Sequence, residues 1–214
     1  MSTSQIHGPN FSTYVRSVRL ALEEKSAPYE LHEVNILGGE HAKPEHLARN
    51  PFAKVPSFTH DHLTIYETSA ILRYIDRAFP GPALQAADAK LAARGDMVMS
   101  IVDSFGYGSI IGKLVWQRMV TPMLGGTPDE DIVAGSLDQV KLCLREFDRL
   151  LGHHHHWFGG DNVGLADLHL APVFGYLMGT AEGREMVGHH SHLHAWFGRM
   201  AERPSMKKTE PVFG

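Results

Sequence analysis

The hydrophobic positions of the first 80 residues occur in short runs that alternate with helical patterns. Val15, Val18 and Leu22 recur at helical spacing in a segment that ends near Lys25, and a second helical pattern covers residues 67–79. The predicted strands cover residues 6–8, 29–34, 55–58 and 63–65. This order of strands and helices predicts a small α/β domain in which helices pack on a mixed sheet.

The pattern changes after Pro80-Gly81-Pro82, which ends a helix and begins a linker. Beyond it the strand signals disappear, and the clearest feature is an apolar stripe over residues 133–151 with a spacing of three or four. Further helices are predicted at residues 91–119, 165–178 and 193–201, although glycines within 91–119 weaken the first of them. We therefore expect domains at residues 1–80 and 88–214, joined by a linker at 81–87.

Composition and charge limit the classes of function that we expect for the protein. The net charge is −4 with histidine neutral, so the surface offers no general attraction to nucleic acid or to anionic lipid. No apolar run is expected to reach the length of a membrane span, and the polar N-terminus lacks a secretory signal, which predicts a cytoplasmic protein. The single cysteine, Cys143, excludes an internal disulfide and a paired-cysteine redox site. Sulfur chemistry would therefore need Cys143 or a thiol brought by a ligand.

Five short segments carry the candidate chemistry. They are Gly8-Pro9-Asn10-Phe11-Ser12-Thr13, the run from Gly39-Glu40-His41 to Pro44-Glu45-His46-Leu47, Asn50-Pro51-Phe52-Ala53-Lys54-Val55-Pro56, Glu67-Thr68-Ser69-Ala70-Ile71 and Val163-Gly164-Leu165-Ala166-Asp167. In this order they resemble the cytosolic glutathione S-transferases, and above all the serine-type members of the phi and theta-like classes. Each segment alone is weakly specific, but the five together are specific.

The resemblance implies a thioredoxin-like α/β domain that binds glutathione and an all-helical domain that contributes a hydrophobic substrate pocket. It implies that Ser12, four residues after Gly8 at the first strand–helix turn, is the catalytic serine. It also implies a cis peptide at Pro56, which would expose the backbone of Val55 to the cysteinyl part of glutathione. The implied glutathione-binding residues are Phe11, His41, Lys54, Val55, Pro56, Glu67 and Thr68.

These residue types suit an anionic tripeptide that carries a thiol. The hydroxyl of Ser12 can donate a hydrogen bond to sulfur and so favour the thiolate, and Arg16 could add positive potential one turn further on. Glu67 can accept from the γ-glutamyl ammonium, while Thr68, at the start of its helix, can donate to the γ-glutamyl carboxylate. His41 and Lys54, the two basic residues among the implied binding residues, can face the glycine carboxylate.

The resemblance implies an enzyme that joins the glutathione thiolate to hydrophobic electrophiles, with peroxidase or dehalogenase activity as further uses of that thiolate. Phe11, Phe105, Trp116 and Met119 are candidates for the electrophile pocket by position alone. A homodimer is implied, with no nucleic-acid or membrane partner. Two alternatives stay open, a glutathione- or ligand-binding carrier with little catalysis and a glutathione-dependent isomerase.

Several candidates also have a purely structural interpretation. Ser12 could serve only as a helix cap. Cys143 lies beside the apolar stripe of its helix and is expected to be a small buried residue. Asp167 is expected to accept backbone hydrogen bonds at a helix start, where Gly164 stands in place of the serine or threonine usual in the family. His153 to His156 are four adjacent ligands in a loop, a poor geometry for a closed metal site, so we expect no resident metal.

Overall fold

A computed structural model describes residues 4–152 and 155–211 of the 214-residue chain. Its backbone contacts divide the chain into two compact units. The first runs to Gln85 and takes in the segment from Arg203 onward, and the second spans Ala86–Glu202. The division after Gln85 falls inside the expected linker at 81–87, whereas the segment from Arg203 groups with the first unit. The domain boundaries given above stay a prediction.

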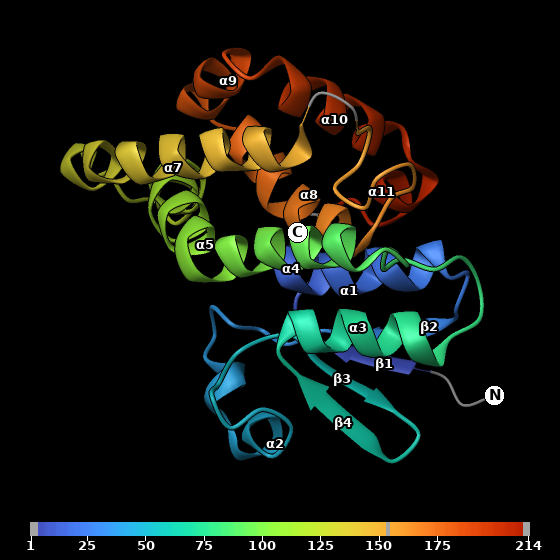
Figure 1. The fold of residues 1–214 in the computed structure, drawn as a ribbon. Coiled ribbons are helices and arrows are strands. Elements are labelled where there is room, and N and C mark those ends of the chain that lie inside the picture. The colour runs from blue at the N-terminus through green and yellow to red at the C-terminus, as the bar shows by residue number, and fades with distance from the viewer. Residues whose placement is uncertain (1–3, 153–154, 212–214) are drawn as a thin grey trace. The chain divides into compact units, whose positions relative to one another are not determined.

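Within the described residues, the first unit contains a mixed four-stranded sheet in the order β2-β1-β3-β4 (Figure 1). β1 (Ser4–His7) pairs in parallel with β2 (Tyr29–His32) and antiparallel with β3 (Ser57–His60), which pairs antiparallel with β4 (Leu63–Tyr66). The four expected strands are confirmed, with shifted ends. β3 begins at Ser57 instead of residue 55, because the proline before it has no N–H to donate to the ladder.

α1 (Thr13–Glu24) and α3 (Thr68–Ala78) pack against each other on one face of this sheet (Figure 1). Both confirm the expected helices. Ile6 and Phe58 are direct partners in the β1–β3 ladder and are fully buried, so they form the centre of the covered face. Successive residues of a strand point to opposite faces, so His7, which follows Ile6, points to the other face.

Two one-turn helices that the pattern did not predict lie between β2 and β3. They are η1 (Glu40–Ala42), a 3₁₀ turn, and α2 (Pro44–Leu47). A single turn is too short to show helical periodicity in the sequence. Pro44 suits the first position of α2, because its fixed φ is helical and no intrahelical partner exists there for an N–H.

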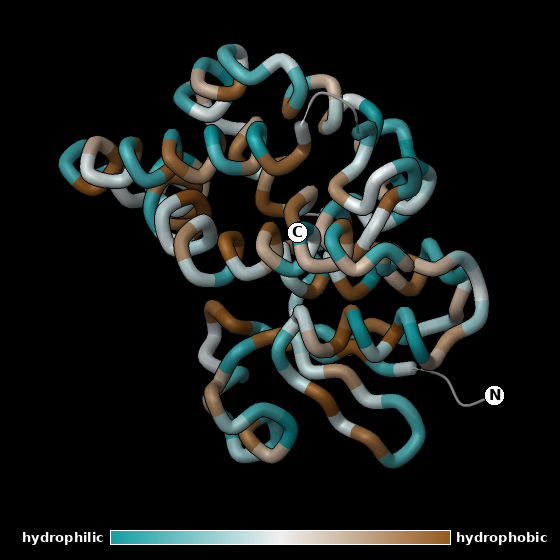
Figure 2. The backbone as a smooth tube through the Cα atoms, viewed as in Figure 1, coloured by the Kyte–Doolittle hydropathy of each residue, from teal (hydrophilic) through white to brown (hydrophobic). Residues whose placement is uncertain are grey.

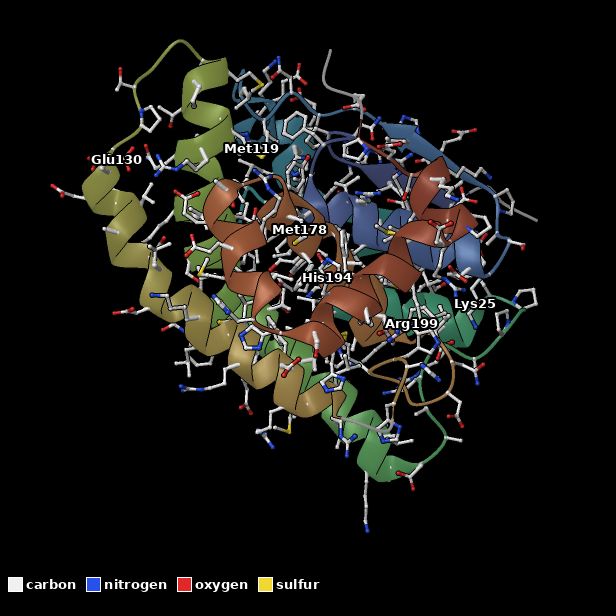
Figure 3. The ribbon with its side chains drawn as sticks, turned by 90° about the horizontal axis from the view of Figure 1, so that it is seen from above. Lys25, Met119, Glu130, Met178, His194 and Arg199 are labelled. Atoms are coloured by element: carbon white, nitrogen blue, oxygen red, sulfur yellow. The ribbon has the colours of Figure 1, made fainter. Side chains whose placement is uncertain are left out.

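A buried ion pair ties α1 to α3 and to the start of the linker. Nζ of Lys25, labelled in Figure 3, lies 2.8 Å from Oδ1 of Asp76 and also donates to the Asp76 carbonyl. The same carboxylate accepts the backbone N–H groups of Leu84 at 2.7 Å and Gln85 at 3.2 Å. Asp76 therefore fixes the chain where it leaves the first unit.

α11 (Pro204–Lys208) packs on α1, which explains why the last segment belongs to the first unit. Nη2 of Arg203 lies 2.6 Å from Oε2 of Glu24. Nη2 of Arg16 donates to the Met206 carbonyl at 2.9 Å. The guanidinium of Arg16 thus contacts this C-terminal segment, a role that the sequence did not indicate.

A continuous helical segment over residues 89–123 opens the second unit. It comprises α4 (Ala89–Ile101), the π-helical η2 (Val102–Gly106), α5 (Tyr107–Ser109), the π-helical η3 (Ile110–Val120) and α6 (Thr121–Met123). The expected helix at 91–119 is confirmed. Its glycines do not break it, and two of them, Gly106 and Gly112, fall within the π-helical stretches.

By length and composition alone, this segment is the one helix of the described residues that is long and apolar enough to cross a membrane. The expectation that no apolar run reaches such a length was wrong, because Asp103 and Lys113 are the only charged side chains between Met97 and Gln117. The core helix of a water-soluble protein passes the same test. Here α4 packs against α8 (Leu165–Met178), and η3 packs against α7 (Glu130–Leu151) and α8.

α8 (Leu165–Met178) packs against α4, η3 and two later helices, and its residues are mostly buried and hydrophobic (Figure 2). α7 (Glu130–Leu151), α8 and α10 (Ser191–Glu202) confirm the other expected helices. α9 (Ala181–Gly188) was not expected, because its eight residues bury only two large apolar side chains, Met186 and Val187.

Asp167 secures the start of α8. Its carboxylate accepts the backbone N–H groups of Phe158 at 3.0 Å and Gly164 at 2.8 Å, and the indole N–H of Trp196 at 2.7 Å. Burial raises the pKa of Asp167 to about 6, against the opposing effect of these donors. The expected structural role is confirmed, with Gly164 at the cap position.

Arg118 joins three helical segments elsewhere in the second unit. Its Nη1 lies 2.6 Å from Oε1 of Glu130, which Figure 3 labels at the start of α7. Its Nε donates to Oε1 of Glu182 in α9 at 2.7 Å. The hydrogen bonds that Arg118 donates to these two carboxylates hold the pKa of its guanidinium above the ordinary value.

Candidate functional site

Three of the predicted segments converge at one end of the sheet. His7 ends β1 and is paired with Ser57, which begins β3, and Ser57 is paired with Tyr66, which ends β4. The turn that holds Ser12 follows the first of these positions. Residues 55–56 precede the second, and residues 67–68 follow the third. The strand register therefore brings the candidate catalytic and binding residues together.

Gly8 allows the turn after β1 to lie against Val55. A Cβ added at Gly8 would lie 2.4 Å from Cγ2 of Val15 and 3.1 Å from Cβ of Val55. The first of these distances is far inside van der Waals contact, so a larger residue would push the two segments apart. The glycine of the first motif thus has a packing reason that joins α1 to the segment before β3.

Asn10 fixes the shape of this turn. Nη1 of Arg19, on α1, donates to its side-chain oxygen at 2.6 Å. The backbone N–H of Asn10 donates to the carboxylate of Glu33 at 3.2 Å, and the Ser12 N–H donates to the Pro9 carbonyl at 3.0 Å. The turn is therefore pinned on both sides before it enters α1.

Ser12 is the N-cap of α1. Its backbone is extended, with φ −67° and ψ 128°, and its Oγ accepts the N–H of Val15 at 3.4 Å. The cap interpretation is confirmed. A hydroxyl that accepts in this way keeps its own proton for another acceptor. A catalytic role for Ser12 is compatible with the cap and stays a prediction.

The Val55–Pro56 peptide bond is cis, as the resemblance implies. The residue before Val55 is Lys54, and its carbonyl is held by two side-chain donors. The Lys54 carbonyl accepts from Nε2 of His46 at 2.8 Å and from Nδ2 of Asn50 at 3.0 Å. Neither donor was predicted from the sequence, although both stand in the quoted motifs. The only available signal was that His46 and Asn50 are polar, stand in these motifs and have no assigned contact with a ligand.

Glu67 connects β4 to α3 in an unusual conformation. Its φ is 69°, in a region that side-chain-bearing residues seldom adopt and that costs of order 1–3 kcal/mol. Its side chain makes no cap hydrogen bond and is exposed, while Thr68 is buried at the first position of α3. The first N–H groups of a helix have no intrahelical partner, so this corner places helix-start N–H groups beside an exposed carboxylate.

The other predicted binding residues lie around this centre. The side chain of Lys54 is exposed, and Phe11, which precedes the cap, is half-buried. His41 lies in η1 and is half-buried, and among the residues the structure describes none accepts from or donates to its Nδ1. Lys43, the next basic residue after His41, pairs with Glu40 at 3.6 Å on the surface.

The candidates for the electrophile pocket in the second unit lie on its long helix. Phe105 and Trp116 are 57% and 41% exposed, which is high for large aromatic side chains. Met119 packs near the end of α8, where its sulfur would lie 3.4 Å from a Cβ at Gly179 (Figure 3). The second unit therefore has accessible apolar side chains at these candidate positions.

The two remaining candidates are Cys143 and the run of histidines from His153 to His156. Cys143 is buried in α7, and burial raises the pKa of its thiol, which confirms the structural interpretation. His153 and His154 lie outside the described residues. Across residues 4–152 and 155–211, no group of three or more His, Cys, Asp or Glu side chains could hold a metal ion.

Comparison with known proteins identifies the family. The N-terminal domain of glutathione S-transferases matches residues 6–83, and the C-terminal domain matches residues 107–204. A probable glutathione S-transferase, GSTF1 of Oryza sativa subsp. japonica, is 34% identical over 216 residues, which cover 99% of this chain and 97% of the rice protein. The chain belongs to the glutathione S-transferase family.

Solved glutathione S-transferases share its fold. Glutathione transferase F7 from Populus trichocarpa matches with a TM-score of 0.85 and 31% identity, over 97% of each chain. Glutathione S-transferase I from maize, in complex with an atrazine glutathione conjugate, matches with a TM-score of 0.84 and 29% identity, over 97% of this chain and 96% of the maize chain. The expected α/β plus all-helical fold and the likeness to the plant F (phi) class are confirmed.

Proposed function

We propose that this member of the glutathione S-transferase family joins the thiol of glutathione to hydrophobic electrophiles. The observation that carries the proposal is the placement of Ser12. Its oxygen accepts from the α1 backbone, so its proton is available to a sulfur atom at the end of the sheet where the motifs converge. The maize relative supports the reaction class, since its structure holds a glutathione conjugate.

Glutathione binds, in this proposal, across that end of the sheet. The backbone of Val55 pairs with the cysteinyl residue, as an added strand would. Thr68 and its N–H donate to the γ-glutamyl carboxylate, while the carboxylate of Glu67 accepts from the ammonium. His41 and Lys54 face the glycine carboxylate. The start of α3 at Thr68 and the exposed Glu67 support this orientation.

In the reaction, the thiolate attacks an electrophilic carbon, an S–C bond forms, and a leaving group such as halide departs with the electron pair. A hydrogen bond from Ser12 favours the thiolate. Lowering a thiol pKa of about 8.5 by roughly 2 units raises the thiolate fraction at pH 7 about 25-fold, and a Brønsted slope of about 0.45 takes back about 8-fold. The remaining few-fold gain means that positioning of both reactants supplies most of the acceleration.

The electrophile, we infer, contacts apolar side chains of the long helix, with Phe105, Trp116 and Met119 as its candidate contacts. The exposure of the two aromatic rings supports this assignment. An apolar surface with few polar groups suits hydrophobic substrates of varied shape.

We further propose that the protein is a cytoplasmic homodimer. Both units carry large apolar side chains in water, such as Phe52 at 64% and Leu124 at 59% exposure, and burial of such groups favours association. The division of the chain into domains at 1–80 and 88–214, with a linker at 81–87, belongs to the same proposal.

Two measurements on the purified chain test the proposed activity. Isothermal titration calorimetry gives the affinity for glutathione, and product formation is followed with a panel of aryl halides, epoxides and hydroperoxides. We expect binding together with turnover that requires both substrates. Binding without any turnover would contradict the enzyme and favour the carrier. Rearrangement of a substrate without consumption of glutathione would favour the isomerase.

A further inference from the structure

Two buried side chains donate hydrogen bonds to the carbonyl of the peptide that joins Lys54 to Val55. His46 and Asn50 are 3% and 1% exposed, and both donate to the Lys54 carbonyl, at 2.8 Å and 3.0 Å. The only cis bond in the described chain is the following one, at Pro56, so this peptide is trans. In a trans peptide the C=O and N–H point in opposite directions. Holding the carbonyl toward His46 therefore turns the Val55 N–H away from it, to the side that the proposed function gives to glutathione.

We propose that His46 is a positioning residue for glutathione, which holds the Val55 edge toward the tripeptide through its hydrogen bond to the Lys54 carbonyl. The proposal rests on the proposed function, because Val55 is the edge to which the tripeptide would pair. His46 touches no substrate in this scheme and acts through the backbone of Lys54 and Val55.

The hydrogen bond fixes the state of the imidazole. A carbonyl can only accept, so Nε2 of His46 carries the hydrogen and the neutral ring has a bare lone pair at Nδ1. Nδ1 is buried, and no atom of residues 4–152 or 155–211 bonds to it.

Calorimetry with glutathione at about pH 7 tests the proposal on the full chain. His46→Leu removes the donor and is expected to raise the Kd about five- to tenfold, with kcat at saturating glutathione within about twofold of the unchanged chain. His46→Gln keeps an N–H donor. We expect its Kd to stay within about twofold of that of the unchanged chain.

His62→Leu, in the exposed turn between β3 and β4, controls for the loss of an imidazole, and circular dichroism checks folding. If the unchanged chain binds no glutathione, the proposed function is contradicted. If it binds and His46→Leu binds equally well, the positioning role is contradicted. A folded His46→Gln chain whose Kd rises about five- to tenfold would contradict a role for the N–H donor, and this variant carries the test if His46→Leu does not fold.

Discussion

At the scale of single residues, Ser12 combines two roles in one hydroxyl. Its oxygen caps α1 by accepting from Val15, and its proton is proposed to reach the glutathione sulfur. Removal of the side chain would damage both roles at once, so Ser12→Ala alone cannot separate them. Substitutions that keep one role and remove the other can.

Ser12→Asp keeps the cap and removes the donor. A carboxylate accepts N–H groups at a helix start as well as serine does, but it has no proton for sulfur and it repels a thiolate. We expect thermal stability close to that of the unchanged chain and a fall in kcat/KM of more than about tenfold. Ser12→Ala should lose about 1 kcal/mol of stability as well as activity, while Ser12→Thr should keep both. Full activity in the aspartate variant would show that Ser12 is only a cap.

His7 makes the stability of the fold sensitive to acid. Its folded pKa of about 4 lies below the ordinary 6.5, mainly because it is buried. As pH falls through about 6.5, His7 takes up a proton in the unfolded chain but stays neutral in the folded chain. Stability that is present at neutral pH is therefore lost in acid. Between about pH 7.5 and pH 5 this amounts to about 2 kcal/mol.

His7→Phe keeps an aromatic ring in place and removes the titration. We expect the free energy of unfolding of this variant, from urea titrations, to fall about 2 kcal/mol less than that of the unchanged chain over the same pH range. Other acidic and basic groups contribute equally to both chains and cancel in the difference. Equal losses in the two chains would show that His7 is protonated in the folded state.

At the scale of elements, the start of α8 depends on one carboxylate that serves three donors. Asp167→Asn keeps one oxygen but turns an NH₂ group toward an N–H donor, which leaves buried donors unsatisfied at about 1–3 kcal/mol each. We expect a loss of about 2–4 kcal/mol in urea unfolding. Asp161→Asn, exposed in the same loop, is the matched control and should change stability by less than about 0.5 kcal/mol. A similar small change at Asp167 would contradict the role assigned to it.

The long elements could be predicted from the sequence because they repeat their pattern. The apolar stripe of α7 runs over most of its length, so the helix was evident. η1 and α2 are single turns, and α9 buries too few apolar residues to show a period. The start of β3 was misplaced because Pro56 could not join the ladder, which only the local backbone reveals.

The candidate site was predictable as far as its residues lie in contiguous motifs. Ser12, Val55, Glu67 and Thr68 are placed together by strand register, as the resemblance implied. Contacts between distant residues could not be foreseen. Arg16 reaches Met206, 190 positions away, and the ring of His46 holds a carbonyl eight positions later. Spacing along the chain carries no information on such pairs.

At the scale of the whole molecule, the proposed homodimer predicts a sedimentation mass twice that of one chain. Phe52 is the most exposed large apolar side chain of the described residues, so Phe52→Asp should place a charge in any apolar interface formed by that loop. We expect this variant to shift toward monomer at micromolar concentration in analytical ultracentrifugation. Phe105→Asp tests the second unit in the same way. A chain that sediments as a monomer at all concentrations would contradict the dimer.

Activation of glutathione at Ser12 is tested most directly by a crystal structure of the chain with glutathione bound. We predict the sulfur within about 3.5 Å of Oγ of Ser12, with the cysteinyl residue of glutathione paired to the backbone of Val55. A sulfur beyond that distance, or one held by another donor such as the hydroxyl of Tyr14, would contradict the assignment.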